Sequence, residues 1–230
     1  MKKATLALSL FVLAIFSAQS VQAQLPVKLS SLKNIPADAE IANALKQALE
    51  QSTSKSVDQL SAVDGFFANA EVKILFPPAA KKAEKTLRSL GLNKLCDDVI
   101  LSLNRAAEHA ARQAAPIFMD AIKQMALHDA LNILLGDKDA ATQYFKLTTA
   151  AKLAASFRPV IKTCLDSANA TRYYATAAAT YNKIPFIKKT DPDITDYVTR
   201  KAIDGLFIEI AKEELYIRQN LSARTTPCMQ

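Results

Sequence analysis

The residues of this 230-residue chain best placed to do chemistry are charged side chains inside an apolar helix near its C-terminal end. A helical wheel of residues 194–219 spreads apolar side chains over an arc of about 200°. Four charged residues fall within that arc: Arg200, Asp204, Glu214 and Arg218. Each acid has an arginine four residues away, so each pair can meet on the helix surface. Charges in an apolar arc are costly unless they are paired or line a cavity. The pattern predicts a polar pocket or, the alternative that we favour, two ion pairs at the ends of the stripe near solvent.

Two further groups of charges could contribute to such a pocket. Arg105 and Glu108 share one stripe of a predicted helix over 94–113, where a solvated, salt-bridged face is the simpler interpretation. Arg158 lies between an aromatic residue and a proline in an apolar run, so it needs a carboxylate partner, and a structural ion pair is its simpler interpretation. The candidate polar cluster is therefore Arg105, Glu108, Arg158, Asp204, Glu214 and Arg218. The wheel places other charges on the outer face of the last helix: Lys201, Glu209, Lys212 and Glu213.

The signatures of common catalytic and metal sites are absent from the sequence. His109 and His128 have no second histidine, cysteine or paired acid at helical spacing, which argues against a zinc or di-iron site. There is no Gly-x-Ser-x-Gly motif, and four scattered glycines cannot form a phosphate-binding loop. We therefore expect no metal and no cofactor. An enzyme that uses Glu214 or Asp204 as an acid or base, activated by burial, stays open as an alternative.

The N-terminal segment has the pattern of a bacterial signal peptide. Two lysines precede an uncharged apolar run over residues 4–18, and small residues stand at the −3 and −1 positions of a cleavage site before Gln24. The run is shorter than the about 20 apolar residues of a membrane-spanning helix. We predict a signal peptide over 1–23, an extended leader over 24–36, and a periplasmic or secreted protein whose mature chain has no transmembrane segment.

The composition predicts an all-α fold. Half of the residues are hydrophobic, only 4 are glycine and none is tryptophan, which disfavours sandwiches, barrels and nucleotide-binding α/β folds. The alanine-rich sequence predicts a single bundle-like helical domain over 37–226, followed by a short tail over 227–230. The expected helices cover residues 37–60, 79–90, 94–113, 116–125, 128–135, 140–147, 149–167, 172–181 and 194–219.

Charge and cysteines constrain the partners only weakly. The formal charge is +7, and the lysines are scattered without aromatic interleaving, so we expect no nucleic-acid binding. Weak attraction to an anionic membrane surface stays possible. Cys96 and Cys164 lie on apolar helical stripes and are expected in the core, where a disulfide between them is left open. Cys228 lies in the tail and is expected to be a free or intermolecular thiol.

Several short stretches between about residues 40 and 226 carry a family resemblance. They are Asp64-Gly-Phe-Phe67, Leu103-Asn-Arg-Ala-Ala-Glu108, Pro116-Ile-Phe-Met-Asp-Ala-Ile122, Asp139-Ala-Ala-Thr-Gln-Tyr-Phe145, Phe157-Arg-Pro159, Thr171-Arg-Tyr-Tyr174, Asp204-Gly-Leu-Phe207 and Ile217-Arg-Gln-Asn220 with Ala223-Arg-Thr-Thr226. Together they resemble the bacterial domain of unknown function 4197 family. The resemblance implies an exported α-helical envelope protein, and it implies no activity and no catalytic residues. All six residues of the candidate polar cluster match the family pattern. Cys96 departs from it, which puts a family disulfide in doubt.

Three functions follow as hypotheses. The first is a ligand- or lipid-binding module whose apolar pocket uses Arg105, Arg158 and Arg218 to hold an anionic head group. The second is a structural or interaction protein of the envelope whose helical faces dock a protein partner or a second copy. The third is the enzyme already described. We expect a non-catalytic protein.

Overall fold

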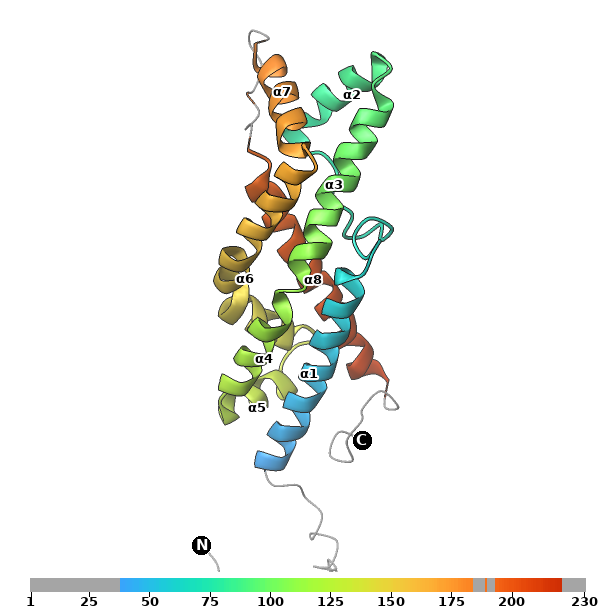
Figure 1. Ribbon diagram of the computed structural model, residues 1–230. Coiled ribbons are helices and arrows are strands. Elements are labelled where there is room, and N and C mark those ends of the chain that lie inside the picture. The colour runs from blue at the N-terminus through green and yellow to red at the C-terminus, as the bar shows by residue number, and fades with distance from the viewer. Residues whose placement is uncertain (1–37, 184–188, 190–192, 221–230) are drawn as a thin grey trace, which may run out of the picture. The chain divides into compact units, whose positions relative to one another are not determined.

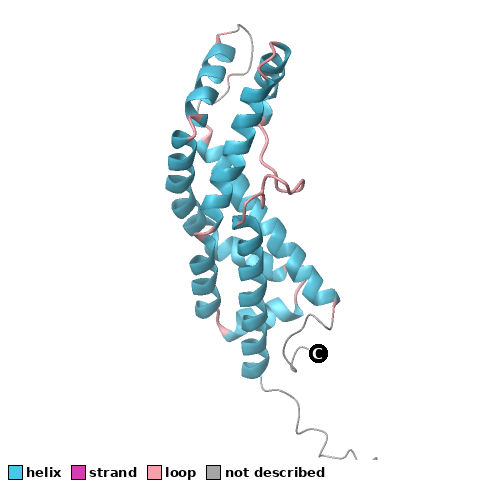
Figure 2. Cartoon of the chain, turned by 45° about the vertical axis from the view of Figure 1, so that its right-hand side comes forward, coloured by secondary structure: helices cyan, strands magenta, loops and turns pink. Residues whose placement is uncertain are grey.

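The computed structural model describes residues 38–183, 189 and 193–220, and in these ranges the regular structure is helical, without a strand. The all-α prediction is therefore confirmed (Figures 1 and 2). The elements are α1 (Asp38–Ser61), the 3₁₀ turn η2 (Pro78–Ala80), α2 (Lys81–Ser89), α3 (Asn93–Ala111), α4 (Ala114–Gln124), α5 (Leu127–Leu135), α6 (Ala140–Ser167), α7 (Ala170–Asn182) and α8 (Thr195–Gln219). No helix in the described ranges is both long and apolar enough to cross a bilayer.

The core forms where α8 packs against α6, α3 and α1. On α8, fully buried apolar side chains recur every fourth residue, at Val198, Ala202, Leu206 and Ile210. At the end of α3 and the start of α4, the buried apolar positions between residues 106 and 114 are alanines, which let the neighbouring helices approach closely. Rows of side chains four residues apart form the ridges through which packed helices interdigitate. The row of buried side chains on α8 thus forms a ridge, and the small alanine side chains leave the space into which such a ridge packs.

Helix α6 joins two helices that the sequence predicts separately, over 140–147 and 149–167. Its fully buried residues also stand four apart, from Phe145 to Leu165. Each such step turns by about 40° around the helix, so the buried face turns through about 200° over five steps. Helix α6 accordingly contacts α4, α5 and α8 as well as α3 and α7. The expected cap at Thr149 is wrong, because its hydroxyl donates to the Phe145 carbonyl at 2.6 Å inside the continuous helix.

The longest described connection, residues 62–77 between α1 and α2 (Figure 2), is fastened by buried side chains of other helices. The Asn104 side chain of α3 accepts a hydrogen bond from the Ile74 N–H and donates to the Ile74 carbonyl, both at 2.8 Å. On α8, a Cβ at Gly205 would lie 2.6 Å from the Phe66 ring, so only glycine allows this close approach. The connection is therefore a defined part of the fold.

The predictions for the signal peptide, the leader and the tail, including Cys228, lie outside the described residues. They stay predictions.

Candidate functional site

Glu108 and Arg105 fasten the turn that follows α1. The Glu108 carboxylate accepts hydrogen bonds from the backbone N–H groups of Phe66, at 3.1 Å, and Phe67, at 3.2 Å. Its other oxygen binds the Arg105 guanidinium at 2.6 Å, and that guanidinium also binds Asp64 at 2.7 Å. These contacts raise the pKa of Arg105, and the hydrogen bond that Arg105 donates to Glu108 contributes most. Glu108 is buried, so the expectation of a solvated face is wrong at this position.

Glu214 and Arg218 form the ion pair that the sequence predicts, at 2.9 Å; the Arg218 side chain is partly exposed, but Glu214 is buried. Glu214 also accepts hydrogen bonds from the N–H groups of Ala141, at 3.0 Å, and Thr142, at 2.9 Å, and from the Thr142 hydroxyl at 2.9 Å. It thereby caps the start of α6. Arg218 donates to the Ile133 carbonyl of α5 at 2.8 Å. Because these donors occupy both oxygens, the carboxylate has no lone pair left for a substrate proton.

The other two predicted residues lie at the surface. Arg158 binds Asp196 at 2.7 Å and Asp193 at 3.5 Å, and the hydrogen bond that Arg158 donates to Asp196 raises the pKa of Arg158. Asp204 is exposed. The helical wheel predicts an ion pair between Asp204 and Arg200, but the structure instead pairs Asp204 with Lys201, at 3.8 Å. The six predicted residues therefore fall in four separate places, and the structure does not bring them together into one pocket.

One buried carboxylate was not predicted. The wheel places Glu209 on the outer face, but the residue is only 3% exposed. Its side chain accepts hydrogen bonds from Asn69, at 2.9 Å, and Lys212, at 3.0 Å. Lys212 also forms an ion pair with Glu71. The cover over Glu209 comes from the connection between α1 and α2, about 140 residues earlier in the chain, and nothing in helical periodicity signals it.

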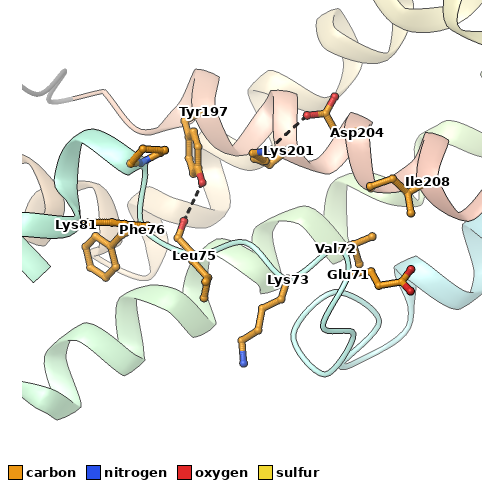
Figure 3. A pocket seen from close by; sticks show the side chains of 12 residues that line it. Glu71, Val72, Lys73, Leu75, Phe76, Lys81, Tyr197, Lys201, Asp204 and Ile208 are labelled. Atoms are coloured by element: carbon orange, nitrogen blue, oxygen red, sulfur yellow. Dashed lines mark hydrogen bonds and ion pairs between the residues drawn. The ribbon is translucent and has the colours of Figure 1, made fainter.

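The candidate binding site is a cleft of about 260 Å³ between residues 71–78 and α8 (Figure 3). Its apolar side chains include Val72 and Phe76 from the connection and Ile208 from α8. The Tyr197 hydroxyl donates across the cleft to the carbonyl of Leu75 at 3.1 Å, which holds the two walls together. Burial raises the pKa of Tyr197, so its hydroxyl stays protonated and keeps this bond.

Three lysines and two acids line the same cleft. The Lys73 ammonium points away from α8 and lies 3.9 Å from the centre of the Phe67 ring (Figure 3). Lys201 pairs with Asp204 at the long distance of 3.8 Å. Lys81 is the first residue of α2, where the helix dipole disfavours a cation, and no carboxylate of the described residues lies within ion-pair distance of its ammonium. The cleft thus combines an apolar floor with one uncompensated ammonium and one weakly paired ammonium.

The structure also locates cysteine and potential metal-ligating side chains. The described residues contain no group of three His, Cys, Asp or Glu side chains that could hold a metal ion. Cys96 and Cys164 are both free thiols, and burial raises the pKa of each. Thiols with raised pKa are poor nucleophiles.

The profile of one protein family, described as "Protein of unknown function (DUF4197)", matches residues 36–230. The chain belongs to this family. Membership of the DUF4197 family confirms the resemblance carried by the sequence motifs. No curated protein and no solved structure is detectably similar to this DUF4197 chain. The family description assigns no activity, so the function has to be argued from the geometry.

Proposed function

We propose that this DUF4197 protein is an exported, non-catalytic binding protein that holds a small anionic amphiphile in the cleft between residues 71–78 and α8. The observation that carries the proposal is the lining of the cleft, which combines apolar side chains with Lys81, for which no ion pair is found among the described residues, and Lys201, which pairs at only 3.8 Å. The apolar part of the ligand would cover Phe76 and Ile208, and its anionic group would bind the two lysines.

Electrostatics favour an anion over a cation in this cleft. Both lining acids are engaged by lysines, Asp204 by Lys201 and Glu71 by Lys212. Lys81 adds its positive charge to the positive end of the α2 dipole. An anion bound there would interact favourably with both the ammonium group and the helix dipole. A volume near the lower end of the range of ligand pockets, about 300–1,000 Å³, favours a small ligand or one end of a longer one.

The hydrogen bonds of the buried carboxylates support a binding role rather than a catalytic one. The carboxylate oxygens of Glu108, Glu209 and Glu214 accept hydrogen bonds from donors within the same domain. Removing such a donor to make room for a substrate would cost fold stability. The signal-peptide pattern before Gln24 supports export to the periplasm or the cell exterior.

Native mass spectrometry of the protein purified from the periplasm, before and after organic extraction, tests the proposal directly. We expect a reproducible added mass that extraction removes. Titration of the extracted protein with decanoate, a probe with an apolar chain and one carboxylate, should then show saturable binding by calorimetry. A clean mass together with no decanoate binding would contradict the proposal.

Charge variants locate the site. Lys81→Gln with Lys201→Gln should weaken decanoate binding about tenfold, because each partly exposed charge contact contributes up to about 1 kcal/mol. The matched control is Lys123→Gln with Lys152→Gln, which removes two exposed lysines on α4 and α6, outside the cleft. Equal losses in the two proteins would show that only general charge matters and that the cleft is not the site.

A further inference from the structure

The turn between α2 and α3 presents two leucines to solvent at one end of both helices (Figure 1). Leu90 is 70% exposed and Leu92 is 42% exposed. The Leu92 N–H donates to the Leu87 carbonyl at 3.0 Å and the Gly91 N–H to the Arg88 carbonyl at 3.0 Å, the two bonds of a Schellman motif. Gly91 has the positive φ of +83° that this ending requires. The turn therefore holds both leucines in fixed, exposed positions.

The surroundings of this turn are basic. We call residues 82–94 the α2–α3 tip. Lys82 and Lys85 are exposed, and no carboxylate of the described residues lies within ion-pair distance of either ammonium. The tip also contains Arg88 and Lys94, which pair with acids, and a single acid of its own, Glu84.

An aromatic side chain stands beside the tip. Tyr173 of α7 is about half exposed and borders the same small cavity as Leu87 of α2 and Leu95 of α3. Tyrosine is enriched where proteins meet the interfacial region of a bilayer, because it has an apolar ring and a polar end. The tip thus combines the three side-chain types that peripheral membrane proteins use: aliphatic, aromatic and basic.

The two most exposed leucines of the described residues do not lie in a comparably basic segment. Leu135, at the end of α5, is 83% exposed and Leu147, on α6, is 88% exposed. The turn between these helices carries Asp137 and Asp139 on either side of one lysine. Exposed leucines therefore occur both at the α2–α3 tip and at Leu135 and Leu147. The excess of positive charge is what distinguishes the tip.

We propose that the α2–α3 tip docks on an anionic phospholipid surface. Leu90 and Leu92 enter the boundary between head groups and acyl chains, and Lys82 and Lys85 lie over the lipid phosphates. The inference is independent of the proposed ligand, since none of these four residues lines the cleft.

Vesicle flotation tests the inference with the purified protein. We expect binding to vesicles of equal parts phosphatidylcholine and phosphatidylglycerol, and little binding to phosphatidylcholine alone. Lys82→Gln with Lys85→Gln should weaken binding about 30-fold, since each lysine near an anionic surface contributes about fivefold. Both lysines are exposed and unpaired, so this variant keeps the fold even if a leucine variant does not.

Leucine variants separate insertion from simple charge attraction. Leu90→Ser with Leu92→Ser should lose binding at least tenfold, because the apolar area that enters the bilayer is gone. The matched control, Leu135→Ser with Leu147→Ser, should bind within a factor of two of the unchanged protein. Three results would overturn the inference: no binding to anionic vesicles, equal losses in the tip and control variants, or binding only to an acidic protein surface.

Discussion

Replacing Glu214 by alanine is expected to destabilise the domain by about 3 kcal/mol. The change leaves the N–H groups of Ala141 and Thr142 without their acceptor at a buried helix start, and each unsatisfied buried donor costs about 1–3 kcal/mol. It also removes the carboxylate partner of Arg218. Loss of one member of a buried ion pair costs about 3–5 kcal/mol, but Arg218 is 27% exposed and can turn toward water, which lowers the total. In a domain of this size, the expected fall in Tm is about 9 °C.

Urea unfolding followed by far-ultraviolet circular dichroism measures this effect. The matched control is Glu213→Ala on the same helix, which removes an ion pair with the exposed Lys55 and should cost less than about 1 kcal/mol. Arg218→Ala should fall between the two, because Glu214 then keeps its bonds to the start of α6. If Glu214→Ala costs no more than Glu213→Ala, the carboxylate does not fasten α6 and the reasoning is wrong.

Three further results are expected. Asn104→Ala should cost about 2 kcal/mol in urea unfolding and speed amide hydrogen exchange in residues 73–76, because the buried side chain holds that segment; unchanged exchange would contradict it. Gly205→Ala should lower stability by about 1–3 kcal/mol in thermal melts, because the added Cβ would press on the buried Phe66 ring, and a neutral result would mean that the ring can move aside. In the native protein, iodoacetamide should leave Cys96 unmodified and label Cys164 slowly, as read by peptide mapping, because burial raises the pKa of both thiols; fast labelling of Cys96 would refute its burial.

Helix positions could be predicted from the sequence where proline and glycine mark the ends. The predicted helix over 37–60 corresponds to α1, and the predicted end at Gly91 is the observed one. The prediction fails within α6, where it breaks the helix before Thr149. There the buried residues stand four apart, so the apolar face turns around the helix and no single stripe of period 3.6 is visible. Tertiary packing on several sides decides such a helix.

The candidate site was harder to predict, for a related reason. A helical wheel assumes that a helix buries one face, whereas α8 packs against α1, α3 and α6 and also lies under the connection between α1 and α2. Glu209 is buried by that connection. The pair of Glu214 and Arg218 could be predicted because both residues belong to one helix. The role of Glu214 as a cap for α6 could not, because it depends on a contact across 73 residues of sequence.

The acids of this domain that are buried are bound by the protein itself, whereas several exposed lysines are available to a ligand. A carboxylate taken out of water has to be satisfied by donors of the protein, and those donors are then unavailable to a ligand that comes and goes. Exposed ammonium groups such as Lys81, Lys82 and Lys85 keep their hydration until a partner arrives, so engaging them costs little. Binding that depends on such groups weakens as salt screens the charges. We therefore expect salt to weaken decanoate binding at the cleft and vesicle binding at the tip alike, whereas serine at Leu90 and Leu92 should affect the vesicles alone.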